Sequence, residues 1–259
     1  MKILVLTDIH GSPDKIFNYL DNNSVDSIII TGDITDFGPE DYFVEILNKF
    51  SNYANVYALQ GNCDPANSSD LLDKSNITNI HDNVSNIDEM IILGFGGSNP
   101  TPFDTPNEFS EEILYEKLSK FNNQLSSDSF TILVTHAPPY DTNADKIESG
   151  VHVGSKSIRK IIEETQPTLN LCGHVHESIG QDTIGKTTII NPGDAGNGHA
   201  CLIELSKEDI KNKTFNLNIF TIEWGNNHGK VWRRRCLHIQ QRKRMYDSWR
   251  IQRITTKKT

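Results

Sequence analysis

Short apolar runs alternate with amphipathic segments along the first 60 residues of the chain. The runs begin at Ile3, Ile28 and Val56, and each holds about four residues, mostly branched. Such runs are too short for buried helices and are typical of strands that are buried on both faces. Residues 13–20 and 39–50, which lie between them, place apolar side chains at helical spacing. The pattern therefore predicts βαβ units in a mainly parallel sheet, with Ser12 as the N-cap of the first helix.

The rest of the chain carries a second set of apolar runs that is less regularly interleaved with helices. Two stretches, residues 111–121 and 154–162, have helical spacing, and residues 98–107 contain three prolines and predict a loop. A second sheet is therefore expected. Its candidate strands are residues 89–95, 130–134, 169–171, 187–190, 200–205 and 215–222.

Polar side chains that can bind metals follow the apolar runs. Asp8 and His10 come directly after the first run, and residues i and i+2 of an extended segment point to the same side, so they form a chelating pair. Alone, each candidate also fits an ordinary turn or helix cap. Seven of them in five loops at strand ends, where sites form in parallel sheets, are an improbable coincidence. The seven are Asp8, His10, Asp33, Asn62, His136, His174 and His176.

The loops that carry these residues form five ordered motifs. They are Asp8-x-His10, Gly32-Asp33-x-x-Asp36, Gly61-Asn62-Cys63-Asp64, Thr135-His136 and Gly173-His174-x-His176. In this order, over about residues 1–222, they resemble the motifs of the calcineurin-like metallophosphoesterases. The resemblance implies an α/β fold, a four-layer αββα sandwich of two mixed β-sheets flanked by helices, with a dinuclear metal centre at one rim.

The resemblance also implies which residues hold each metal ion. Asp8, His10, Asp33 and His176 are expected to bind one ion, and Asp33, Asn62, His136 and His174 the other, with Asp33 as the bridge. Mixed carboxylate, imidazole and amide donors suit Mn²⁺, Fe²⁺, Ni²⁺ or Zn²⁺ better than Ca²⁺, and Mn²⁺ is favoured here. Two such ions can activate a hydroxide for in-line attack on phosphorus, so no serine or cysteine nucleophile is required.

Four further catalytic assignments concern residues in or near the ligand loops. Asn62 is a weak ligand, so its metal ion is expected to keep a position for a substrate oxygen. Asp36 and Asp64 either hold the ligands in place or are simple turn residues, and the sequence favours neither. His152, in the loop after His136, is a candidate proton donor to the leaving group. A solvated histidine in a helix-capping loop explains His152 at least as well.

Cys63 departs from the family pattern. Many members have histidine there, to protonate the leaving group or grip the phosphate, whereas a thiol is a weak donor and its thiolate would repel phosphate. Branches that resemble this sequence in carrying cysteine still hydrolyse phosphodiesters, often with activated leaving groups. We therefore expect a phosphodiesterase acting on a small phosphoester. Alternatives are a phosphomonoesterase on a small metabolite, a nuclease that uses the basic C-terminal tail, and a non-catalytic metal-binding scaffold. The complete ligand set argues against the scaffold.

Charge divides the chain. Residues 224–259 contain eleven Lys or Arg and one Asp, a net charge of +10, whereas residues 1–223 have a net charge of −19. We expect a catalytic domain at residues 1–223 and a basic, flexible extension whose interspersed aromatic residues are compatible with nucleic-acid contact. No signal-peptide pattern or membrane-spanning apolar run is present, and the four cysteines are widely spaced. These features predict a cytoplasmic protein, either a monomer or a homodimer, without membrane contact.

Overall fold

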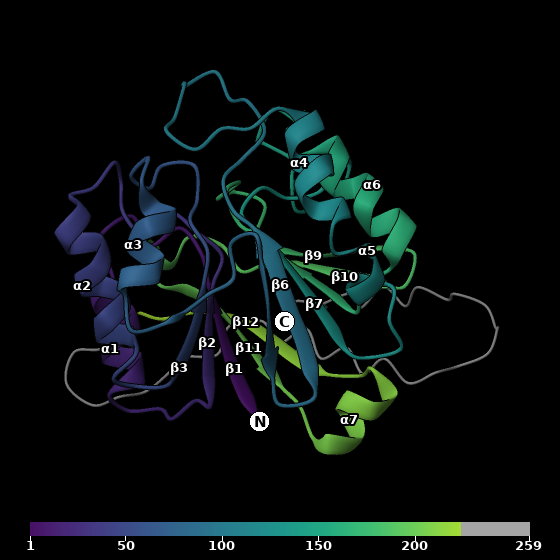
Figure 1. Ribbon diagram of the computed structural model, residues 1–259. Helices are drawn as coiled ribbons and strands as arrows, with labels where there is room; N and C mark the ends of the chain where they lie inside the picture. Colours follow the sequence, from purple (N-terminus) through teal and green to yellow (C-terminus); the bar gives the residue numbers. More distant parts are fainter. Residues whose placement is uncertain (224–259) are drawn as a thin grey trace, which may run out of the picture.

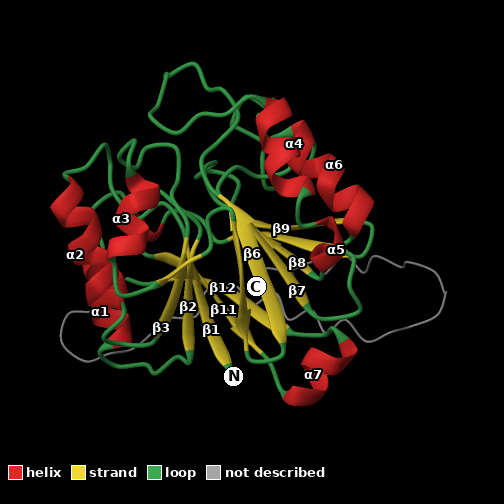
Figure 2. Cartoon of the chain, in the orientation of Figure 1, coloured by secondary structure: helices red, strands yellow, loops and turns green. Residues whose placement is uncertain are grey.

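The computed structural model describes residues 1–223, and the prediction for the basic extension lies outside these residues. Two six-stranded sheets pack face to face, and helices cover their outer faces (Figure 1, Figure 2). Both sheets contain parallel and antiparallel pairs. The four-layer fold implied by the family resemblance is therefore confirmed.

The first sheet has the strand order β12-β11-β1-β2-β3-β4, and its four strands from β1 to β4 run parallel. Helices α1, α2 and α3 lie against its outer face (Figure 1). The elements are β1 (Lys2–Leu6), α1 (Asp14–Leu20), β2 (Ser27–Ile30), α2 (Glu40–Phe50), β3 (Asn55–Ala58), α3 (Ser68–Lys74), β4 (Thr78–Asn79), the 3-10 helix η1 (Ala195–Asn197), β11 (His199–Glu204), α7 (Lys207–Asn212) and β12 (Asn216–Thr221).

The second sheet has the order β5-β6-β7-β8-β10-β9, with parallel pairing from β6 through β10. Helices α4, α5 and α6 cover it (Figure 2). The elements are β5 (Asn83–Ile87), β6 (Met90–Phe95), α4 (Glu111–Ser119), α5 (Asn122–Leu125), β7 (Thr131–Thr135), α6 (Lys156–Thr165), β8 (Leu169–Leu171), β9 (Gly180–Ile184) and β10 (Thr187–Asn191).

Alternation along the central strands produces three apolar layers. In β1, Leu4 and Leu6 pack against the helices, whereas Ile3 and Val5 face the second sheet, and all four are fully buried. Burying one such side chain stabilises the fold by about 1.5–3 kcal/mol. Because both faces of the strand are buried, the run is apolar throughout. This packing fixes the strand ends, which carry the candidate ligands.

Three groups of features differ from the sequence prediction. Residues 200–205 and 215–222, expected in the second sheet, form β11 and β12 of the first sheet, because β11 pairs antiparallel with β1. Strands β4, β5 and β9 were not predicted, because these edge or near-edge strands consist mostly of exposed or half-buried residues and lack a clear apolar pattern. The assignment of Ser12 as an N-cap is wrong, since Pro13 occupies that position without a side-chain cap. Ser12 belongs to the preceding turn, where its N–H donates to Ile9 O. Within residues 1–223, every helix is too short or too polar to cross a bilayer.

Candidate metal centre

Four of the seven candidate ligands have backbone in the left-handed region. The φ angles are 54° at Asp8, 47° at His10, 51° at Asp33 and 68° at His174. This conformation is uncommon outside glycine, and such strain gathers at functional sites. Backbone hydrogen bonds fix the turns, because Asp8 N donates to Gly32 O and His10 N to Asp33 O, both at 3.0 Å. The loops after β1 and β2 therefore support each other and aim their side chains at one place.

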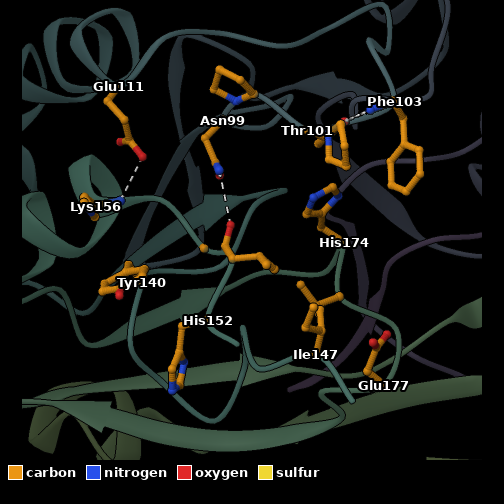
Figure 3. A pocket seen from close by; sticks show the side chains of 15 residues that line it. Asn99, Thr101, Phe103, Glu111, Tyr140, Ile147, His152, Lys156, His174 and Glu177 are labelled. Atoms are coloured by element: carbon orange, nitrogen blue, oxygen red, sulfur yellow. Dashed lines mark hydrogen bonds between the residues drawn. The ribbon is translucent and has the colours of Figure 1, made fainter. Parts of the chain in front are cut away.

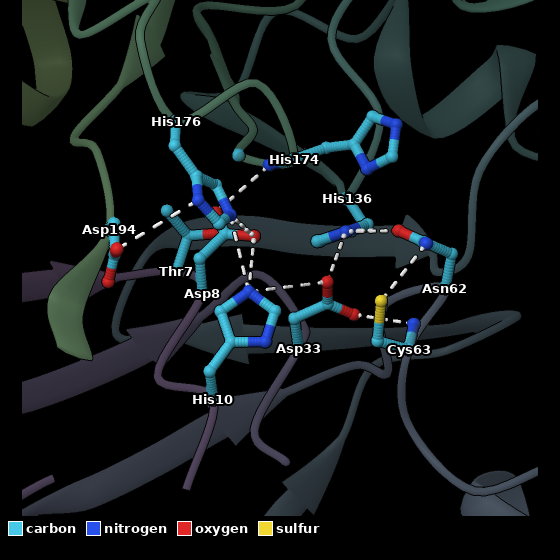
Figure 4. Close-up of polar contacts among 12 residues, drawn as sticks. Thr7, Asp8, His10, Asp33, Asn62, Cys63, His136, His174, His176 and Asp194 are labelled. Atoms are coloured by element: carbon cyan, nitrogen blue, oxygen red, sulfur yellow. Dashed lines mark hydrogen bonds and ion pairs between the residues drawn. The ribbon is translucent and has the colours of Figure 1, made fainter. Parts of the chain in front are cut away.

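Asp8, His10 and His176 bring their ligand atoms within 4.8 Å of one another (Figure 4). Asp8 is fully buried, and its Oδ1 has no hydrogen-bond partner in the part of the chain that the structure describes. This atom lies 3.2 Å from His176 Nε2 and 3.8 Å from His10 Nε2. The two imidazole Nε2 atoms face each other at 3.2 Å. A cation among these atoms would satisfy all three.

Asp33, His136 and Asn62 form the adjoining part of the site. His136 Nδ1 lies 3.0 Å from Thr31 O, which can only accept, so this nitrogen carries a proton. Its Nε2 faces two further oxygens, Asn62 Oδ1 at 2.9 Å and Asp33 Oδ2 at 3.3 Å. In a neutral imidazole protonated on Nδ1, the lone pair of Nε2 would point at these two acceptor oxygens, which is repulsive. Burial lowers the pKa of His136, but the charge of Asp33 outweighs it and raises the pKa to about 9, so a proton takes the place that a metal ion would fill.

Asp33 lies between the two groups, as a bridging ligand requires. Its Oδ2 is 3.3 Å from His136 Nε2 and 3.8 Å from His10 Nε2. Asp8 and His136 also join Asp33 in a second group of ligand atoms that lie within 4.8 Å of one another. The structure therefore brings six of the seven sequence-predicted ligands together.

The ring of His174 belongs to neither group. Its backbone N–H donates to Asp8 Oδ2 at 3.0 Å, while the ring packs edge-on against His136, with centroids 5.1 Å apart. Burial is the main cause that lowers the pKa of His174 to about 4, so the imidazole is neutral at pH 7, the form that binds metals. The Asp8 carboxylate, 3.2 Å from His176 Nε2, raises the pKa of His176 to about 8 against the effect of burial.

The structure shows that Asp64 and Asp36 have different surroundings, a difference that the sequence does not reveal. Asp64 is fully buried and accepts hydrogen bonds from Thr35 N and Gly61 N, both at 2.8 Å, and from Ile34 N at 3.2 Å. It therefore ties the loop after β2 to the loop after β3. Burial and the charge of Asp33 raise its pKa to about 7. Asp36 is exposed, and its side chain makes no hydrogen bond or ion pair within residues 1–223.

Cys63 supports Asp33 through its backbone. Its N–H donates to Asp33 Oδ1 at 2.8 Å, and its Sγ lies 3.3 Å from Asn62 Nδ2. Burial, and then the charge of Asp33, raise the pKa of the Cys63 thiol far above its usual value. The thiol therefore stays protonated at neutral pH, so the expected repulsion between a thiolate and phosphate does not arise.

Three supporting residues were missed by sequence reasoning. Thr7 Oγ1 donates to Asp8 Oδ2 at 2.7 Å, and Thr105 Oγ1 accepts from Asn62 Nδ2 at 3.0 Å. Asp194 Oδ2 lies 3.8 Å from His176 Nδ1. The sequence signal for Asp194 is the glycine-rich segment of residues 191–196, in which Gly196 N donates to Asp8 O at 3.1 Å. Such partners orient metal ligands.

A cavity of about 790 Å³ opens beside His174, and His152 lines it (Figure 3). His152 Nδ1 lies 2.6 Å from Oδ1 of the fully buried Asp145, and its Nε2 lies 3.6 Å from Asp141. Figure 3 shows His152 and His174 at different parts of the wall. The role of His152 as a proton donor stays a prediction.

The side chains at this rim fit divalent metal ions. Two carboxylates, three imidazoles and one amide converge, and the buried Asp8 Oδ1 has no protein hydrogen bond in the described residues. The donor set matches the one that transition metals prefer.

Comparisons with known proteins agree with this arrangement. The family model described as calcineurin-like phosphoesterase matches residues 1–178. A protein of Methanocaldococcus jannaschii, named uncharacterized protein MJ1162, is 42% identical over 197 residues, which are 74% of this chain and 88% of that protein.

Solved structures with the same fold are more distant in sequence. TT1561 of Thermus thermophilus has a TM-score of 0.64 at 16% identity, over 86% of this chain and 99% of that one. A dimetal phosphatase from Danio rerio has a TM-score of 0.57 at 12% identity, over 87% and 99% of the two chains. GAP50, described as the anchor in the inner membrane complex of Plasmodium, also reaches 0.57, at 13% identity over 94% and 90%. These structures share the fold, and the family match shows that the chain belongs to the calcineurin-like phosphoesterases.

Proposed function

We propose that this protein hydrolyses phosphodiesters with the help of two divalent metal ions, of which Mn²⁺ is favoured. The single observation that carries the proposal is the buried, unpartnered Asp8 Oδ1 facing two histidines, beside an Asp33 carboxylate that faces both ligand groups within the described residues. Membership of the calcineurin-like phosphoesterase family supports metal-dependent phosphoester hydrolysis.

Each candidate ligand has a place in this proposal. Asp8, His10 and His176 would hold one ion, Asn62, His136 and His174 the other, and Asp33 both. When bound, such ions supply a hydroxide nucleophile and neutralise charge on the phosphoryl oxygens. Thr31 O fixes the tautomer that leaves His136 Nε2 free to act as a ligand, and Asp64 holds the two ligand loops in register.

Cys63 supports the choice of phosphodiesters. Its protonated thiol is a weak hydrogen-bond donor, so departure of the leaving group depends on the acidity of that group itself. Family branches with cysteine at the matching position resemble this chain and act on phosphodiesters with such leaving groups.

The test is hydrolysis of bis-p-nitrophenyl phosphate and of p-nitrophenyl phosphate by purified protein with Mn²⁺. We expect turnover of the diester to exceed that of the monoester, and to vanish with EDTA and in Asp33→Ala. Asp36→Ala, a nearby exposed aspartate, is the matched control and should retain full activity. Preference for the monoester would overturn the choice of phosphodiesters. Absence of hydrolysis of both substrates by protein that binds Mn²⁺ would favour the scaffold alternative. GAP50, which shares the fold, is described as an anchor.

A further inference from the structure

One carboxylate organises the long loop between β6 and α4. Glu108 accepts hydrogen bonds from the backbone N–H and the hydroxyl of both Thr101 and Thr105, at 2.6–2.9 Å. We call residues 98–108 the Glu108 loop. Its base is closed by Ser98 N, which donates to Asn107 O at 3.1 Å. A loop this long without helix or strand is typical of binding loops, and here its shape is fixed in advance.

The Glu108 loop is also bonded to the metal centre. Thr105 Oγ1 accepts from Nδ2 of the ligand Asn62, and Asn107 N donates to Asn62 O at 3.2 Å. Asn107 Nδ2 donates to Asp64 O at 2.7 Å. Any group that the loop presents therefore has a defined position relative to the candidate metal ligands.

What the loop presents is an exposed aromatic ring. Phe103 lines the cavity beside His174, and 80% of its surface is accessible (Figure 3). Pro100 and Pro102 of the same loop line the cavity as well, and Ile147 and Val175 add further apolar wall. These apolar residues share one cavity beside the candidate metal centre, and such a group indicates a surface for a ligand to cover.

The charges of the cavity limit the size of that ligand. Its lining residues include one lysine, Lys156, against Glu111 and Glu177. Glu111 is occupied by the first turn of α6, since it accepts from Ser157 N at 2.8 Å and from Lys156 N at 3.0 Å. A wall with so little positive charge does not compensate several phosphates. A volume of about 790 Å³ lies in the usual range for a small organic ligand.

We propose that the cavity binds the organic group of the phosphodiester, and that the preferred substrates carry a planar aromatic or heteroaromatic ring, as in a single nucleotide unit, stacked on Phe103. This inference rests on the proposed phosphodiesterase function and names its substrate class. Stacking of a base on an aromatic side chain changes affinity by roughly 5- to 150-fold.

The experiment measures binding to the Mn²⁺-loaded protein by calorimetry, so that it does not depend on turnover. Adenosine 5′-monophosphate and ribose 5-phosphate share the sugar and the phosphate and differ in the ring. We expect the nucleotide to bind about tenfold more tightly. Phe103→Leu, which keeps apolar bulk without a ring, should abolish this difference, Phe103→Trp should retain it, and ribose 5-phosphate should bind equally to all three proteins.

The two proposals fail in different ways. Equal binding of the two compounds by the unaltered protein, or an unchanged preference in Phe103→Leu, would overturn the ring-binding inference even if bis-p-nitrophenyl phosphate is hydrolysed. Tighter binding of octyl phosphate than of the nucleotide would also overturn it, in favour of an alkyl group. Absence of diester hydrolysis in a protein that binds Mn²⁺ would overturn the proposed function and the substrate class that rests on it, whereas a ring preference measured by calorimetry would stand.

Discussion

The metal rim and the Glu108 loop lie side by side, but they are held in place by different means. At the rim, ligands directly follow β1, β2, β3, β7 and β8, and backbone hydrogen bonds join their loops. In the Glu108 loop, backbone hydrogen bonds fix only the base, through Ser98 and Asn107, and four hydrogen bonds to one carboxylate hold the rest of its shape. The sheets therefore position the candidate metal ligands, while a few side chains hold the surface that we propose contacts the substrate. Under the proposed function, a change of the Phe103 side chain alters specificity and leaves the metal ligands in place, whereas a change at Thr105 affects both regions.

The largest expected effect concerns the buried aspartate that joins two rim loops. In Asp64→Asn, an amide NH₂ replaces one carboxylate oxygen and faces the N–H groups of Ile34 or Gly61. At least one buried backbone N–H then has no acceptor. We expect the free energy of unfolding to fall by about 3 kcal/mol in urea titrations. The control Asp36→Asn should change it by less than about 0.5 kcal/mol. Equal losses in both variants would show that Asp64 does not brace the rim.

A half-buried histidine that contacts Gly96, two residues before the Glu108 loop, should make the fold sensitive to acid. His81 Nδ1 accepts from Gly96 N at 3.0 Å, and burial is the main cause that lowers its pKa to about 4. Between pH 6.5 and 4 the unfolded chain binds a proton that the folded chain does not, so stability is lost as pH falls, by up to about 3 kcal/mol. His81→Asn keeps an acceptor for Gly96 N–H but does not titrate. If the free energy of unfolding of His81→Asn, measured by urea titration, falls as steeply with pH as that of the unaltered protein, His81 does not cause the acid sensitivity.

Thr105 connects the two regions, and its loss should affect one metal ion. Thr105→Val removes the oxygen that accepts from Asn62 Nδ2 and so frees the amide to turn. Losing such a partner of a metal ligand typically weakens metal affinity about 10- to 100-fold. Calorimetric titration with Mn²⁺ should show this loss at one of two sites, with Thr105→Ser restoring the affinity. Unchanged binding in Thr105→Val would mean that Asn62 is held by other contacts.

The smallest effect is expected at His152. Its Nδ1 is engaged with Asp145, and it contacts none of the candidate ligands within residues 1–223. We expect His152→Gln to change kcat for bis-p-nitrophenyl phosphate by less than about threefold, since the acidic leaving group needs little protonation. The same comparison of kcat is then made with a phosphodiester whose alkyl leaving group departs slowly without protonation. A large loss on that substrate alone would identify His152 as its proton donor.

The sequence predicts the metal rim because the strands that carry the ligands produce a repeating apolar pattern along the chain. Apolar runs such as residues 3–6 mark strands, strand ends mark loops, and neighbouring parallel strands bring Asp8, Asp33 and Asn62 to one edge. The Glu108 loop has no period, and nothing in the sequence links Thr101 and Thr105 to Glu108 before the chain folds. The ring orientation of His174, the contrast between Asp64 and Asp36, and the polar edge strands β5 and β9 likewise depend on tertiary contacts.

The most direct test of the central claim is the number of Mn²⁺ ions that one chain binds, measured by equilibrium dialysis on unaltered, His176→Asn and Asp33→Asn proteins. Because Asp33 Oδ2 faces both ligand groups, Asp33→Asn should weaken both sites, whereas His176→Asn should weaken one. The account predicts two ions for the unaltered chain. Fewer than two ions in the folded, unaltered protein, or two undiminished sites in Asp33→Asn, would contradict it.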